Sequence, residues 1–176
     1  MRRSIAVLLL AGALFFSACG TSASLDLRLF CERFNHVSQG QARLEMEQFD
    51  VRPMANGQKY ASFLGFGEYV AAKTRDDGRV HTVSLTGLPE GTQADFYDAA
   101  GRLLAAFADI TGAEADGLLR SVHVGAKPVL GIRKVEMNGF RLSYAANEAG
   151  RYFRVSRVRD LPPETEMATL REMIID

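Results

Sequence analysis

The sequence predicts an α+β fold, a single domain in which an antiparallel sheet of about six or seven strands carries helices on one face. Two observations predict this class. The two-residue turn signals Asp77-Gly78 and Asn138-Gly139 each join segments in which apolar and polar residues alternate, as hairpins require. Other segments carry apolar residues at helical spacing. Hairpins and amphipathic helices are both accommodated when the helices gather on one face of an antiparallel sheet.

Four segments have the pattern of amphipathic helices. Residues 25–38 carry one apolar stripe that ends before a glycine. Thr92 and Asp95 resemble a capping box with Asp in place of Glu, and they open the longest helical stripe of the chain. A shorter helix is expected after Gly112, and a last one over residues 164–175.

Alternation before the second helix predicts four strands, at residues 43–52, 58–66, 68–76 and 79–86. Counting outward from a two-residue turn at Asp77-Gly78 places His81 opposite Thr74, at the end of the apolar face. A histidine there is expected to be a hydrogen-bonded structural residue.

The register of the last three strands follows from two turns, at residues 138–139 and 147–150. Both turns independently assign the same apolar face to these strands, which is a strong internal check. The opposite face then carries the candidate binding residues, which are Lys134, Arg141 and Arg154. In this register Glu136 opposes Arg141, and Ser143 lies between the other two bases.

The charges of the chain balance, but they are not evenly distributed along it. The 176 residues hold 21 basic and 21 acidic side chains, so no global charge draws the protein to nucleic acid. Residues 127–159 carry eight bases and two acids, whereas residues 90–116 carry six acids and one base. The sequence therefore predicts a charge dipole between an acidic helical half and a basic group of strands.

The usual local signatures of catalysis are missing from the sequence. No nucleotide-binding loop, nucleophile elbow, metalloprotease histidine pair or Cys-x-x-Cys occurs, so we expect no metal, no cofactor and no enzymatic activity. Cys31 lies on the apolar stripe of its helix and is interpreted as a core residue. For a dispersed active site, the first candidates are the three histidines His36, His81 and His123.

The N-terminus has the order of a bacterial secretory signal. Arg2-Arg3 precede an apolar run over residues 5–16, which is too short to span a bilayer, and the small residues Ser17 and Ala18 precede Cys19. The stretch 16–20 resembles the lipobox of bacterial lipoproteins, with Phe16 where the family usually has Leu. The resemblance implies that signal peptidase II cuts before an acylated Cys19. The alternative is a plain secretory signal cut after Ala18, with a free cysteine.

This resemblance implies the domain organisation and the location of the protein. Residues 1–18 are a signal peptide, residues 19–24 a tether reaching about 15 to 20 Å, and residues 25–176 the folded domain. Removal of the signal leaves 19 bases against 21 acids, a net charge of −2. Two or three acyl chains would then hold the domain stably on the extracytoplasmic side of a bacterial membrane, in the cell envelope.

The leading functional hypothesis is therefore a lipid-anchored binding or interaction module that uses the basic sheet face. Its partner would be an anionic lipid headgroup, an anionic polymer or an envelope protein, and not a nucleic acid. Two alternatives are a small envelope hydrolase with a dispersed site and an assembly or chaperone-like lipoprotein that offers a sheet edge to a partner strand.

Overall fold

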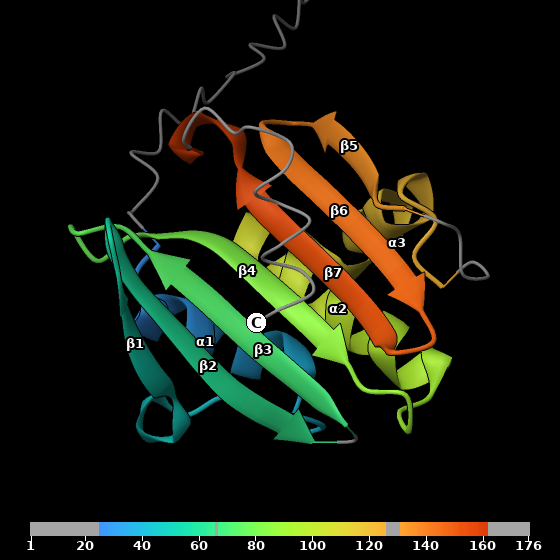
Figure 1. Ribbon diagram of the computed structural model, residues 1–176, viewed down its shortest axis with the longest axis horizontal. Helices are drawn as coiled ribbons and strands as arrows, with labels where there is room; N and C mark the ends of the chain where they lie inside the picture. The colour runs from blue at the N-terminus through green and yellow to red at the C-terminus, as the bar shows by residue number, and fades with distance from the viewer. Residues whose placement is uncertain (1–24, 66, 126–130, 162–176) are drawn as a thin grey trace, which may run out of the picture.

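The computed structural model describes residues 25–65, 67–125 and 131–161, which form one antiparallel sheet with three helices on one face (Figure 1). The strand order is β1-β2-β3-β4-β7-β6-β5. The strands are β1 Asp50–Met54, β2 Gly57–Gly65, β3 Glu68–Thr74, β4 Val80–Gly87, β5 Arg133–Met137, β6 Phe140–Asn147 and β7 Gly150–Arg157. The predicted α+β class and strand number are confirmed.

Side-chain caps set the starts of the three helices. They are α1 Leu27–Ser38, α2 Gln93–Ala108 and α3 Gly112–Ser121. The carboxylate of Asp26 caps α1, and the Thr92 hydroxyl accepts from the backbone N–H of Asp95 at α2, as predicted. A complete capping box opens α3, where Thr111 and Glu114 bond reciprocally, and the Thr-x-x-Glu pattern that produces it was overlooked in the sequence.

The sheet consists of two meanders that are local in sequence and meet along one seam. Strands β1 to β4 follow one another in chain order, as do β5 to β7, and β4 pairs with β7 to join the two groups. At the seam the hydroxyls of Thr82 and Ser156 lie 3.0 Å apart. Helices α2 and α3 fall between the meanders in sequence and pack behind the sheet (Figure 1).

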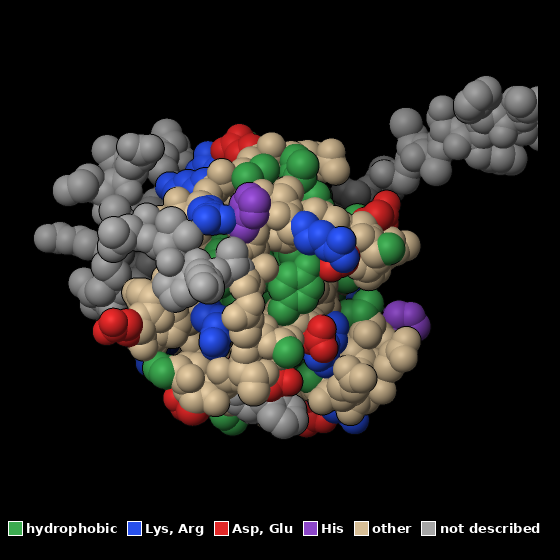
Figure 2. All heavy atoms as spheres, turned by 90° about the vertical axis from the view of Figure 1, so that its right-hand side faces the viewer, with side chains coloured by type: hydrophobic (Ala, Val, Ile, Leu, Met, Phe, Trp, Pro, Cys, Tyr) green, Lys and Arg blue, Asp and Glu red, His purple; other side chains and the backbone are tan. Residues whose placement is uncertain are grey.

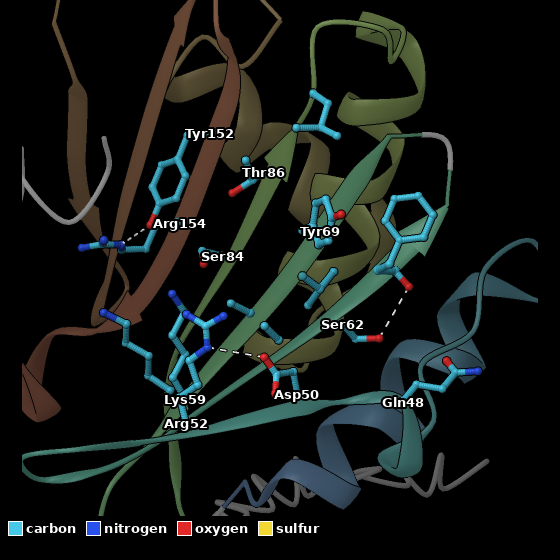
Figure 3. A pocket seen from close by; sticks show the side chains of 16 residues that line it. Gln48, Asp50, Arg52, Lys59, Ser62, Tyr69, Ser84, Thr86, Tyr152 and Arg154 are labelled. Carbon is cyan, nitrogen blue, oxygen red and sulfur yellow. Dashed lines mark hydrogen bonds and ion pairs between the residues drawn. The ribbon is translucent and has the colours of Figure 1, made fainter. Parts of the chain in front are cut away.

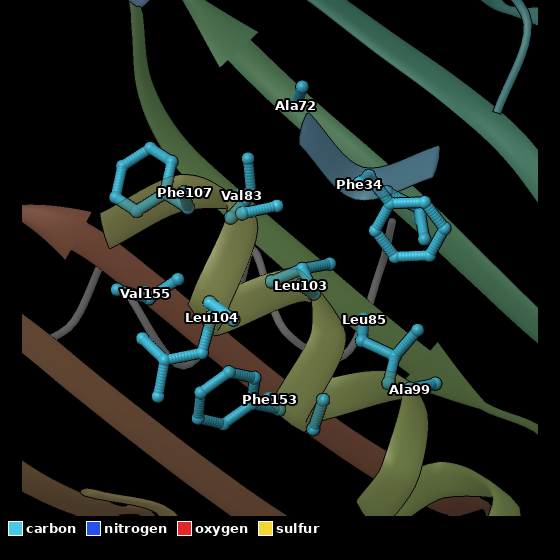
Figure 4. Close-up of a cluster of buried hydrophobic side chains, with 14 of the residues drawn as sticks. Phe34, Ala72, Val83, Leu85, Ala99, Leu103, Leu104, Phe107, Phe153 and Val155 are labelled. Atoms are coloured by element: carbon cyan, nitrogen blue, oxygen red, sulfur yellow. The ribbon is translucent and has the colours of Figure 1, made fainter. Parts of the chain in front are cut away.

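The core lies between the sheet and the helices (Figure 4). Phe153, Val155 and Leu85 point from the sheet toward Leu103 and Leu104 of α2, and all five are fully buried. At about 25 cal/mol per Å² of apolar surface, this layer is the main source of stability for the described part of the chain. Cys31 is buried in the same core, as predicted.

The predicted pairing of His81 with Thr74 is wrong, because the hairpin turn is longer than two residues. Arg75 N–H donates to the Arg79 carbonyl, which leaves a three-residue loop that ends in the positive-φ residue Gly78. Thr74 therefore pairs with Val80. His81 becomes an extra residue in a β-bulge, and beyond it the predicted register is restored.

The predicted strand at residues 43–52 is also wrong in its boundaries. Met46–Gln48 form a 3₁₀ helix, and the strand that follows, β1, begins only at Asp50 and continues through Pro53 to Met54. Proline lacks a backbone donor, but it is tolerated here because β1 is an edge strand.

Two predicted segments lie outside the described residues, namely the N-terminal region 1–24 and the helix at 164–175. Among the helices that the structure describes, none is long and apolar enough to cross a membrane.

Candidate functional site

The candidate site lies on the face of the sheet opposite the helices, called here the helix-free face because the described residues place no helix on it (Figure 1). Cross-strand pairing arranges its side chains in rows that run across the strands. Because successive side chains of a strand alternate between faces, every second residue contributes to this face.

The three predicted binding residues lie on this face, in the predicted register. Lys134 and Arg154 are in one row on either side of Ser143, and Arg141 is in the next row. Their surroundings differ. Lys134 is exposed, Arg141 forms an ion pair of 2.7 Å with Glu136, and the buried Arg154 donates from Nε to the phenol oxygen of Tyr152 at 2.7 Å.

The basic residues of the last three strands do not gather into one patch. Arg157 points to the helix side, where its guanidinium lies over the rings of Phe107 and Phe140, and Arg151 donates to the carbonyl of Gly91. Figure 2 faces the side where α3 and β5 lie, and it shows basic and acidic side chains interspersed among apolar ones. The basic residues of the last three strands are therefore divided between the two faces of the sheet.

A hollow of about 510 Å³ occupies the other part of the helix-free face, over β1 to β4 and the edge of β7 (Figure 3). One end of the hollow has a cationic row of Arg52, Lys59 and Lys73, which are direct neighbours across β1, β2 and β3. The other end has an aromatic row of Phe63, Tyr69 and Tyr152. Between them the floor is made by Ala61, Ala71 and Ser84.

The cationic row was missed in the sequence because its members come from three strands. The hairpin formed by β2 and β3 pairs Lys59 with Lys73, but the register shifts by one residue between Phe63 and Gly65, so a count outward from the Gly65–Glu68 pair would have placed Thr74 opposite Lys59. The third member, Arg52, depends on the pairing of β1 with β2. Its guanidinium also contacts the carboxylate of Asp50, with an N to O distance of 3.4 Å.

The most perturbed carboxyl group lies on the helix side of the sheet, at the start of β3. Glu68 is buried, and its Oε1 has no hydrogen-bond partner among the described residues. The pKa of Glu68 is raised to about 7, first by burial and then by the nearby carboxylates of Asp95 and Asp98, against the opposing effect of Arg102. This group is a candidate for a titration close to neutral pH.

The three histidines lie on different elements. His36 is in the last turn of α1, His123 follows α3 with positive φ, and His81 is in the β4 bulge, where its Nδ1 lies 3.0 Å from the Thr82 hydroxyl. Burial lowers the pKa of His81, which favours the neutral ring. This arrangement agrees with a structural role for His81.

A second hollow of about 590 Å³ contains His36 together with several carboxylates. Two of these carboxylates are engaged, since Asp109 pairs with Arg33 at 3.0 Å and Glu114 belongs to the capping box of α3. Within the ranges that the structure describes, no group of three or more His, Cys, Asp or Glu side chains is close enough to hold a metal ion.

Comparison of the chain with protein-family models, curated proteins and solved structures finds no match.

Proposed function

We propose that this protein is a bacterial lipoprotein, anchored through acylated Cys19 on the extracytoplasmic side of the membrane, that acts as a non-enzymatic binding module for an anionic ligand. The anchor is supported by the order of charged, apolar and small residues before Cys19. Binding is supported above all by the hollow on the helix-free face, whose volume falls within the usual range for ligand sites.

The chemistry of the hollow favours an anionic partner. Arg52, Lys59 and Lys73 bring three positive charges together on adjacent strands, which lie about 4.8 Å apart. Such a group attracts an anionic lipid headgroup, an anionic envelope polymer or an acidic protein. The contact surface is thereby centred on this cationic row, and Lys134 and Arg141 lie outside the hollow.

The anchor is tested by labelling cells with radioactive palmitate. The wild-type protein should incorporate the label, and Cys19→Ala should not, because the thioether at this sulfur precedes cleavage. Labelling of the variant at the wild-type level would overturn the lipoprotein assignment.

The binding surface is tested by co-sedimentation of the protein with anionic vesicles and with cell-wall fractions. The double variant Lys59→Ser/Lys73→Ser should weaken binding about tenfold or more, since each charge-assisted contact contributes about 1.5 to 3 kcal/mol. The matched variant Lys134→Ser/Arg141→Ser removes two cations from the same face outside the hollow and should have a smaller effect. Binding that neither variant weakens would refute a binding function of this face.

A further inference from the structure

On β2 and β3 the hollow has a shared polarity gradient that runs along the strands, and the charged side chains of Asp50 on β1 and Arg154 on β7 border it at the level of the alanines. On β3 the residues of the helix-free face are Tyr69, Ala71 and Lys73 in order. On β2 they are Phe63, Ala61 and Lys59, which run in the same spatial direction because the strands are antiparallel and directly paired. These two strands therefore each present an aromatic ring, a methyl group and an ammonium group in sequence along the hollow, in which Figure 3 labels Tyr69 and Lys59.

The cationic end favours a single compact anion. Lys59 lies opposite Lys73 on one side and opposite Arg52 on the other. A carboxylate or phosphate placed among these three side chains would accept charge-assisted hydrogen bonds from them. Lys59 and Lys73 are only partly exposed, so such contacts would be less screened than at an open surface.

The aromatic end favours an apolar group. Phe63 and Tyr69 are 53% and 45% exposed, and their rings meet edge to face with centroids 5.1 Å apart. Two large neighbouring rings left exposed on a sheet form an apolar contact surface. In the same row Tyr152 lines the hollow from β7, and its phenol oxygen is bound by Arg154, which directs its polar end toward that base.

The two ends are separated by a length that suits a chain rather than a compact molecule. Tyr69 and Lys73 are four positions apart in the chain, which corresponds to about 13 Å along a strand. The floor between them consists of Ala61 and Ala71, whose methyl groups leave room for a ligand, with Ser84 beside them. A ligand that fits the hollow has an acidic group at the cationic end and an unbranched apolar chain that extends from it toward the aromatic end.

We infer that the hollow binds a single-chain anionic amphiphile, with its acidic headgroup at Arg52, Lys59 and Lys73 and its acyl chain lying over Ala61 and Ala71 toward Phe63 and Tyr69. This inference rests on the proposed binding function and names its ligand class. Charge complementarity fixes the orientation, because the headgroup and the chain cannot exchange ends without placing the anion against the rings.

The test is isothermal titration of the full chain carrying Cys19→Ser, so that no protein-bound acyl chain competes. The probe is dodecanoate below its micelle concentration, with dodecanol and acetate as ligands that lack the charge and the chain. Dodecanoate should bind with 1:1 stoichiometry and at least about tenfold more tightly than either. Lys59→Gln/Lys73→Gln and Phe63→Ser should each weaken it about tenfold, and Lys134→Gln, on the same face, should stay within about twofold.

The outcomes separate this inference from the proposed function. If dextran sulfate binds in a Lys59- and Lys73-dependent manner but dodecanoate binds no tighter than acetate, the amphiphile is refuted and anion binding by this face stands. If dodecanoate binds but neither the lysine nor the Phe63 variant weakens it, the site lies elsewhere and the inference fails. If neither probe binds, both the inference and the proposed function are refuted.

Discussion

Replacement of Glu68 by Gln should make the protein more stable, and only above mildly acidic pH. The side chain is 4% exposed at the start of β3 and faces Asp95, Asp98 and Arg102 of α2. Burial, and then the two aspartates, raise its pKa from 4.5 to about 7, so the folded protein favours the protonated carboxyl. Glutamine keeps the shape and the neutral charge of that form.

The sign and size of the effect follow from proton linkage. Below about pH 4.5 the carboxyl is protonated in both states, and its titration leaves stability unchanged. Between about pH 4.5 and 7 the folded state binds more protons than the unfolded state, so stability falls as pH rises. The rise in the pKa of Glu68 from 4.5 to about 7 corresponds to a loss of at most about 3 kcal/mol in the free energy of unfolding at pH 8, because one pKa unit is 1.36 kcal/mol.

The assay is thermal unfolding followed by circular dichroism from pH 5 to pH 8. The difference in Tm between Glu68→Gln and wild type should grow with pH to at most about 6 to 12 °C, since 1 kcal/mol corresponds to about 2 to 4 °C at this chain length. The exposed Glu148 provides the matched control, and Glu148→Gln should show no such growth. A difference for Glu68→Gln that is constant across this range would refute the assigned titration.

Three further predictions concern packing, backbone conformation and thiol chemistry. Leu104→Ala should reduce the free energy of unfolding by about 2 to 5 kcal/mol in urea titrations, because Leu104 is fully buried beneath the sheet. Gly150→Ala should lower the free energy of unfolding by more than about 1 kcal/mol, because φ at Gly150 is +143° and an added Cβ would lie 2.4 Å from the Gly87 carbonyl oxygen. Gly117 lies on α3 with open space where a Cβ would be, so Gly117→Ala should raise the free energy of unfolding by up to about 1 kcal/mol. Burial raises the pKa of the Cys31 thiol to about 12, so in a Cys19→Ser background a disulfide reagent should label nothing at pH 8 until the protein is unfolded; fast labelling of the native protein would contradict this.

The sequence was most informative where two local signals restricted the same strand. The register of β5, β6 and β7 was predicted correctly because each of the two turns assigned Leu142 to the same face, opposite Val135 and Val155. The Asp77-Gly78 hairpin had only one signal, and the same dipeptide also closes a three-residue loop. The bulge at His81 compensates for that extra residue, and alternation alone does not reveal it.

The candidate site was less predictable because it depends on contacts between distant segments. Lys134 and Arg154 could be placed in one row from local turns. The hollow instead requires β1 beside β2 and β4 beside β7, and Arg154 borders it only because β7 pairs with β4. Neither strand order nor the burial of a side chain such as Glu68 among helix residues can be obtained from hydrophobic periodicity.

The seam between the meanders has a consequence for how the protein folds. Each meander closes through short turns, whereas Thr82 and Ser156 at the seam are separated by 74 positions in the chain, a span that includes α2 and α3. Loop-closure entropy makes this pairing the most demanding contact of the sheet, and contact order of this kind slows folding. We therefore expect seam formation to limit the folding rate, with α2 helping to collect both meanders beforehand. In kinetic terms, we expect each meander to form quickly on its own and the pairing of β4 with β7 to be the slow step.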